Sequence, residues 1–167
     1  MESTEDDVAG AAAATQSPPR QREFTFAALP HELQAARMRI AAALAQDLAA
    51  VGAAELLSEL TLALDEALNN ALEHGAASVA RVAAESPSAI RVLLETTPRL
   101  WRATVRDPGH GFDLLAVPPP DALAATGGFG IALLRSIVSR LSSRRLPDGH
   151  ELLLERVLIS PPRAPVP

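Results

Sequence analysis

The pattern of apolar and polar positions predicts strands and helices that alternate in small groups. Residues 23–29, EFTFAAL, alternate between polar and apolar side chains and predict a strand. Residues 31–51 have a helical period, which Gly52 interrupts. A second helix is expected over residues 54–74, with Gly75 in the position of a C-terminal cap.

The second half of the chain predicts two hairpins and a third helix. Residues 89–95 and 99–107 read as strands joined by TTP, and residues 142–146 and 151–158 flank the turn PDGH. Between the hairpins, residues 131–141 have a helical apolar face. Hairpins produce antiparallel pairs, so the expected fold is α+β: a two-layer sandwich of a mostly antiparallel sheet, covered on one face by three helices.

The length and the two ends of the chain predict one folded domain with tails. A chain of 167 residues suits a single domain, which we place at residues 23–160. Residues 1–22 combine acidic, Ala and Pro-containing segments and are expected to be disordered, and residues 161–167 form a Pro-rich tail. No apolar run reaches the roughly 18 residues of a membrane span, and the acidic start is unlike a secretory signal. These features favour a cytoplasmic protein with no membrane partner.

Composition excludes several kinds of chemistry. The chain has no Cys, which removes disulfides, thiol catalysis and Cys-based zinc sites. All 15 basic residues are Arg, so the lysine of a P-loop and the amine of a Schiff-base enzyme are absent. A net charge of −5 gives no general reason to expect direct contact with nucleic acid.

The predicted second helix carries a polar stripe that its core face does not explain. Glu66, Asn70 and His74 are spaced by four residues and therefore share one face. The expected core face carries Leu60, Leu64, Leu68 and Leu72. A carboxylate can accept a proton, and an amide oxygen beside it can ligate Mg²⁺. Taken alone, the stripe is more typical of an ordinary solvated helix face.

Two glycine-rich segments add candidate binding groups. In RDPGHGFD (106–113), Asp107 ends a strand and offers an acceptor for an exocyclic amine such as that of adenine, while Gly109 and Gly111 allow close approach of a flat ligand. In TGGFGIALLRSIV (126–138), a glycine-rich loop opens a helix, where free N–H groups favour phosphate. An ordinary glycine-rich turn and a flexible helix entry are the alternatives.

Together, and in this order, the three motifs resemble those of the GHKL ATPases, the superfamily of histidine kinases and DNA gyrase. LTLALDEALNNALEHG resembles the N box, VRDPGHGFD the first glycine box and GGFGIALLRSIV the second, and the closest similarity is to the anti-sigma-factor serine/threonine kinases. The resemblance spans about residues 23–158 and implies the Bergerat-type ATP-binding fold. It implies ATP and Mg²⁺ as cofactors.

The resemblance also implies a role for individual residues. Glu66 takes the position of the catalytic carboxylate, and Asn70 that of the Mg²⁺ ligand in the nucleotide site. Asp107 takes the position of the adenine-binding aspartate, while His74 is expected to support the helix end. The remaining nucleotide-binding positions are Gly109 and Gly111 around the base and Gly128, Gly130 and Ile131 at the phosphates.

The implied partners are a small antagonist protein as phosphoacceptor and a sigma factor or similar regulator, with a possible homodimer through the first strand and helix. One departure from the family pattern leaves an alternative open. The expected lid over ATP, residues 112–127, has no basic residue, although phosphoryl transfer needs positive charge near the transferring group. Arg106 or Arg135 could supply it; otherwise the chain is a nucleotide-dependent binding module with weak or no catalysis.

Overall fold

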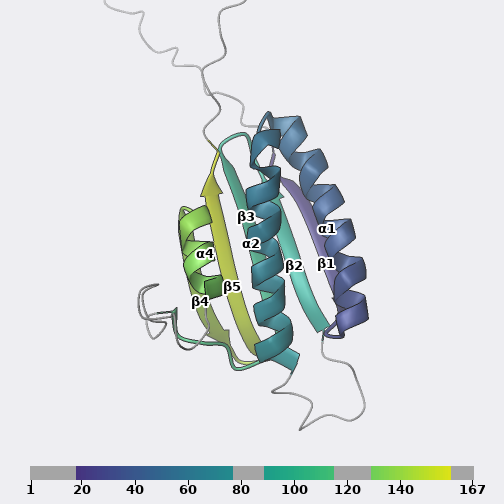
Figure 1. Cartoon of the computed structure of the whole chain (residues 1–167), viewed down its shortest axis with the longest axis vertical. Helices are drawn as coiled ribbons and strands as arrows, with labels where there is room; N and C mark the ends of the chain where they lie inside the picture. The colour runs from purple at the N-terminus through teal and green to yellow at the C-terminus, as the bar shows by residue number, and fades with distance from the viewer. Residues whose placement is uncertain (1–17, 77–88, 115–128, 159–167) are drawn as a thin grey trace, which may run out of the picture.

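The computed structural model describes residues 18–76, 89–114 and 129–158 (Figure 1). In chain order its elements are β1 (Arg20–Ala27), α1 (Pro30–Val51), the 3-10 turn η1 (Ala54–Leu56), α2 (Leu57–Asn70), the π-helical turn η2 (Ala71–Ala76), β2 (Ala89–Thr96), β3 (Leu100–Asp107), α4 (Phe129–Ile137), β4 (Arg140–Leu146) and β5 (Gly149–Val157). No helix among these is long and apolar enough to cross a membrane.

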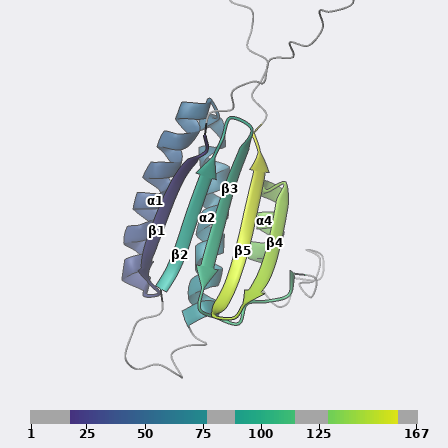
Figure 2. The same ribbon diagram turned by 180° about the vertical axis from the view of Figure 1, so that it is seen from behind.

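The five strands form one sheet in the order β1-β2-β3-β5-β4, with antiparallel pairing throughout. The described helices all lie on one face, with α1 and α2 side by side and α4 toward the β4 edge (Figures 1 and 2). This arrangement confirms the predicted two-layer α+β sandwich. It also brings the end of β3 beside the start of β5, where Asp107 pairs with His150.

The core between the layers is aliphatic and contains the leucine face predicted for the second helix. Leu60 and Leu68 of α2 are fully buried, and Leu64 is 2 % exposed. Ala63, Ala67 and Ala71 are buried beside these leucines, and their small side chains allow close packing of the neighbouring elements. From the sheet, alternate residues of β2, β3 and β5 meet this surface: Ile90, Val92, Leu94, Trp101, Ala103, Val105, Leu152 and Leu154.

The first strand begins at Arg20, three residues before the predicted start of this strand at residue 23. Its first residues pair with the end of β2, where Arg20 lies opposite Thr96. Arg20 and Arg22 also form ion pairs with Asp47 of α1, whose side chain is only 1 % exposed. A buried carboxylate needs such partners, so a contact distant in sequence brings charged residues of the expected tail into the sheet.

Two other predicted boundaries are wrong. The third helix ends at Ile137, and Arg140 and Leu141, predicted as helical, belong to β4, because pairing with β5 overrides their local helical period. The second helix is not uniform to residue 74. It starts as a 3-10 turn, and η2 continues through Gly75 to Ala76, so Gly75 lies within helical structure.

On the face of the sheet without helices, charged side chains form ion pairs between neighbouring strands. Arg102 on β3 contacts Glu95 on β2 at 3.3 Å and Glu155 on β5 at 2.7 Å. The hydrogen bond to Glu155 raises the pKa of the Arg102 guanidinium above its ordinary value, with Glu95 contributing in the same direction. Toward the other end, Glu151 pairs with both Arg106 and Arg144. These charges keep the exposed face polar and hydrated.

Truncation of the buried leucine face is expected to destabilise the domain much more than truncation elsewhere on α2. Leu68→Ala should lower the free energy of unfolding by about 2–5 kcal/mol, since it leaves a cavity in the core. Leu62, on the same helix, is 44 % exposed, so Leu62→Ala should change stability by no more than about 0.5 kcal/mol. Urea denaturation of both variants measures the difference, and equal losses would contradict this assignment of the core face.

Candidate functional site

The polar end of α2 meets the end of β3 and the start of β5 around one small cavity. Its polar lining residues are Asn70, His74, Asp107 and His150. Its apolar lining consists of Ala67, Ala71, Val105, Phe112 and Leu152. Two of the predicted binding residues, Asn70 and Asp107, are therefore brought together from positions 37 residues apart in the sequence.

Asn70 is the last residue of α2, immediately before the helix widens into the π-helical turn. Its amide Nδ2 is buried and has no hydrogen-bond partner. A buried amide group without a partner costs free energy, and π-turns often occur at binding sites. The neighbouring Asn69 differs, because its side-chain oxygen accepts a hydrogen bond from Arg37 of α1. Asn70 therefore keeps a buried donor without a partner, whereas the side-chain oxygen of Asn69 is already bonded.

Glu66 lies one turn earlier on α2 and faces the beginning of α4. A Cβ atom at Gly130 would come within 2.6 Å of Glu66 Oε2, so glycine allows the helix start to approach this carboxylate. The first turn of a helix presents free N–H groups. The N box and the second glycine box of the sequence thus meet in space.

Asp107 is held in a fixed orientation at the end of β3. Its Oδ1 accepts the backbone N–H of Gly109 at 2.8 Å, and its Oδ2 lies 3.2 Å from His150 Nδ1. Both side chains are buried, at 6 % and 3 % exposure. Gly109, the first glycine of the predicted motif, therefore acts through its backbone N–H, which donates to the Asp107 carboxylate.

Gly111, the second glycine, is required by its conformation and by its neighbour. Its φ is +68°, in the left-handed region, and a Cβ at this position would overlap the ring of His150. His150 Nε2 in turn lies 2.8 Å from Ser143 Oγ, and that hydroxyl donates to the carbonyl oxygen of Phe112 at 2.8 Å. Hydrogen bonds at Gly109 and at Phe112 therefore hold the loop on both sides of Gly111.

His150 and Ser143 were not predicted as site residues. In the sequence, His150 belongs to the PDGH turn and Ser143 to a short polar strand, and both patterns are explained by a hairpin. The signal that could have found them is the pairing of β5 with both β3 and β4, which places His150 opposite Asp107 and next to β4. Strand order cannot be derived from either hairpin alone.

The cavity has the chemistry of a site for a flat heteroaromatic ring, with apolar walls and polar groups at its edges. As it stands, the side chains leave no space for a water molecule between them. Phe112 contributes an aromatic ring to the cavity, with its centroid 5.3 Å from that of His150 and 6.2 Å from that of His74. A bound base therefore requires the Phe112 side chain to move.

The residues around Asn70 also fit a magnesium ion of the kind that accompanies a nucleotide. Mg²⁺ commonly takes one or two protein oxygens and completes its shell with phosphates and water. Asn70 offers one amide oxygen, with the Glu66 carboxylate one turn away on the same helix. In the described residues no cluster of three or more acidic or imidazole groups forms a metal site on its own.

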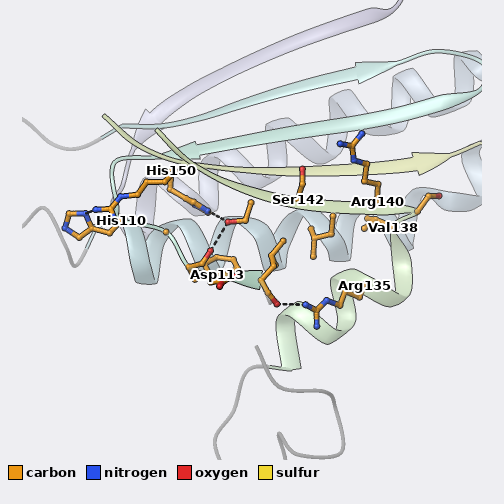
Figure 3. Close-up of a pocket in the computed structure, with 14 residues that line it drawn as sticks. His110, Asp113, Arg135, Val138, Arg140, Ser142 and His150 are labelled. Carbon is orange, nitrogen blue, oxygen red and sulfur yellow. Dashed lines mark hydrogen bonds between the residues drawn. The ribbon is translucent and has the colours of Figure 1, made fainter. Parts of the chain in front are cut away.

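A larger, open cavity of about 780 Å³ lies on the other side of the 110–114 segment, between α4 and β4 (Figure 3). Arg135 borders it from α4 and donates to the Leu114 carbonyl oxygen at 2.5 Å. Arg106 instead pairs with Glu151 on the helix-free face at 2.7 Å. Of the two arginines considered as charge donors, only Arg135 thus lies beside the loop that leads into the expected lid.

Other predicted site residues have a buried side chain or lie outside the described residues. Ile131 is buried in the core with 6 % exposure, so a role toward phosphate would fall to its backbone. Gly128 and most of the expected lid lie outside the described residues. Asp65 and Asn69 both contact Arg37 of α1 and thereby connect the two helices.

Comparison with known proteins supports the grouping of these motifs. The family model described as "Histidine kinase-like ATPase domain" matches residues 26–156. Serine/threonine-protein kinase BtrW of Bordetella bronchiseptica is 34 % identical over 106 residues, which are 60 % of this chain and 70 % of that protein. The crystal structure of the RsbU and RsbW domains of Rv1364c from Mycobacterium tuberculosis matches with a TM-score of 0.54 and 22 % identity. This match covers 83 % of this chain but 32 % of that one, and it supports the fold.

Two glycines with the same backbone conformation provide a matched test of the contact between Gly111 and His150. Gly52 has φ +75° and open space around an added Cβ, whereas Gly111 faces the His150 ring. Gly52→Ala should cost about 1–2 kcal/mol of stability from left-handed strain alone. Gly111→Ala should cost about 1–3 kcal/mol more because of overpacking.

Chemical denaturation of both variants, with and without His150→Ala, separates the two causes. The additional cost at Gly111 should largely disappear in the His150→Ala background, since the overlap is then removed. Equal costs at the two glycines in the wild-type background would show that the His150 ring does not constrain the loop.

Proposed function

The chain belongs to the histidine kinase-like ATPase domain family, and we propose that it is an ATP-binding regulatory serine/threonine protein kinase of the anti-sigma-factor type. In this function it binds Mg-ATP, phosphorylates a small antagonist protein and sequesters a sigma factor or a similar regulator. It acts in the cytoplasm.

The observation that carries the proposal is the position of Asn70, whose amide oxygen is the atom that would ligate Mg²⁺ and whose buried amide nitrogen is a donor without a partner. It lies on the same helix as Glu66, and it shares a cavity with Asp107. Glu66 itself faces the glycine at the start of α4. Candidate groups for base recognition (Asp107), metal ligation (Asn70) and phosphate binding (the start of α4) therefore lie next to one another.

Each group has a role that follows from its chemistry. The Asp107 carboxylate accepts a hydrogen bond from the exocyclic amine of adenine, and the flat ring lies between the apolar walls of the cavity. The Asn70 side chain ligates Mg²⁺, and the backbone N–H groups of Gly128, Gly130 and Ile131 hold the phosphates. Bound ATP supplies the phosphoryl group. Glu66 accepts the proton of the attacking Ser or Thr hydroxyl.

The similarity to a serine/threonine-protein kinase supports the choice of reaction. The anti-sigma resemblance of the three motifs supports the class of partner, and β1 with α1 offers a surface for a homodimer. In the described part of the chain, β1 is an edge strand, and such strands can pair with a second chain.

The second candidate function is a nucleotide-dependent protein-binding module without useful catalysis. It is favoured by the absence of any basic residue between residues 112 and 127. Arg135 is a described alternative, and its guanidinium is already bonded to the Leu114 carbonyl oxygen. In this case Mg-ATP would bind and change the affinity for a partner, but no phosphoryl group would be transferred.

Thermal unfolding with and without Mg-ATP tests the site that both candidates share. At about 100 times its dissociation constant, Mg-ATP should stabilise the wild type by about 2.7 kcal/mol, a shift of several degrees. Asn70→Ala should lose most of this shift. Asn69→Ala is the matched control: it loses the contact with Arg37 but should keep the ATP-induced shift. A full shift in Asn70→Ala would exclude Asn70 as a ligand.

Transfer of labelled γ-phosphate from ATP to antagonist proteins of the anti-anti-sigma type separates the kinase from the binder. Glu66→Gln should slow transfer by about 10²–10⁴-fold, because general-base assistance is lost, while Mg-ATP still binds. Glu73→Gln changes an exposed carboxylate in η2 and should leave the rate unaltered. Unimpaired transfer by Glu66→Gln would remove Glu66 as the base, and wild-type binding without any transfer would favour the second candidate.

A further inference from the structure

We propose that His150, held between Asp107 and Ser143, determines the base specificity of the site by fixing the Asp107 carboxylate toward the exocyclic amine of adenine. His150 is then a positioning residue that acts through Asp107 and does not itself touch the phosphates. The inference rests on the proposed nucleotide binding, and it extends that function to residues of β4 and β5 for which the motifs predict no role.

The geometry forms one hydrogen-bonded chain across three strands. Asp107 ends β3, His150 is the second residue of β5, and Ser143 lies in the middle of β4. The two links are 3.2 Å from His150 Nδ1 to Asp107 Oδ2 and 2.8 Å from His150 Nε2 to Ser143 Oγ. His150 is only 3 % exposed. A buried ring with a partner at each nitrogen cannot turn without breaking these contacts.

The hydrogen-bond capacity of Asp107 leaves room for a base. A carboxylate can accept about four hydrogen bonds; the Gly109 N–H and His150 use one position on each oxygen. An ionised carboxylate only accepts, so Nδ1 is the donor in its contact with Asp107. Ser143 Oγ, whose own hydrogen goes to the Phe112 carbonyl oxygen, likewise accepts from Nε2. The carboxylate therefore stays an acceptor, and its remaining lone pairs have a fixed direction. A donor such as an amine matches them, while a carbonyl oxygen is repelled.

The same three residue types in this order occur in acyl-transfer enzymes, but here Ser143 is not placed as a nucleophile. Its hydroxyl hydrogen is directed to the Phe112 carbonyl oxygen at 2.8 Å, whereas a serine nucleophile gives its proton to the histidine. The arrangement instead ties the 109–112 loop to β4. Phe112 is therefore anchored through its backbone carbonyl oxygen.

The experiment compares the affinities for Mg-ATP and Mg-ITP, which carry the same triphosphate and differ at the 6-position of the base. Wild type should prefer ATP by about tenfold or more, as expected for a hydrogen bond to a charged group. Isothermal titration of each variant gives the ratio, and thermal unfolding confirms that the variant is folded. Because both nucleotides share all phosphate contacts, a general loss of affinity leaves the ratio unchanged.

The variants separate the two links of the chain. His150→Asn can keep the donor to Asp107 and should retain most of the preference for ATP. His150→Gln places its amide toward Ser143 and should lose most of it. Ser143→Ala removes the hydroxyl that contacts His150 Nε2 and should lower the preference for ATP. Ser142→Ala, at the preceding position on β4, is the matched control and should leave this preference unchanged.

The outcomes for the inference and for the proposed function are distinguishable. An unchanged ATP-to-ITP ratio in His150→Gln and Ser143→Ala, with nucleotide still bound, would overturn the inference alone. Equal wild-type affinity for the two nucleotides would also overturn it. If the wild type binds neither, the proposed function fails first and the inference with it.

Discussion

The structure depends on how α2 packs against the sheet. Leu60, Leu64 and Leu68 must be buried against β2, β3 and β5, and this requirement fixes the rotation of the helix about its axis. Side chains four residues apart share a face, so Glu66 and Asn70 cannot be redirected without exposing leucines. Small alanines between the two faces allow close packing. The hydrophobic core therefore sets the direction in which Glu66 and Asn70 point. The loops contribute the groups that face these two side chains.

The opposite face of the sheet shows how a two-layer fold is stable with one face uncovered. Strands require alternation, so every core residue of β3 is followed by one that faces solvent. Two of these positions on β3, Arg102 and Arg106, lie in register with Glu155 and Glu151 of β5, and Arg102 also contacts Glu95 of β2. Isolated surface ion pairs contribute little, whereas a network with partly buried carboxylates is better ordered. The ion pair with Glu151 places Arg106 on the face of the sheet opposite the cavity around Asn70 and Asp107.

Sequence patterns predicted the features that local chemistry determines. The amphipathic helices, the two hairpins and the motifs around Glu66, Asn70 and Asp107 each depend on residues close together in the chain. The misplaced features depend on distant partners: β1 extends to Arg20 because Asp47 requires cations, and β4 takes residues with a helical period because β5 pairs with them. His150 was missed for the same reason, since only the strand order places it against Asp107.

The position of Phe112 connects the closed cavity to ligand binding. Ala67, Val105 and Leu152 form apolar walls, and such walls are unfavourable in contact with water. An aromatic side chain covers them in much the same way as a purine ring would. The Phe112 backbone is held by Ser143, and the next glycine along the loop, Gly111, is held against His150. Asp107, the residue proposed to recognise the base, is already held by Gly109 and His150, and such preorganisation reduces the entropic cost of binding.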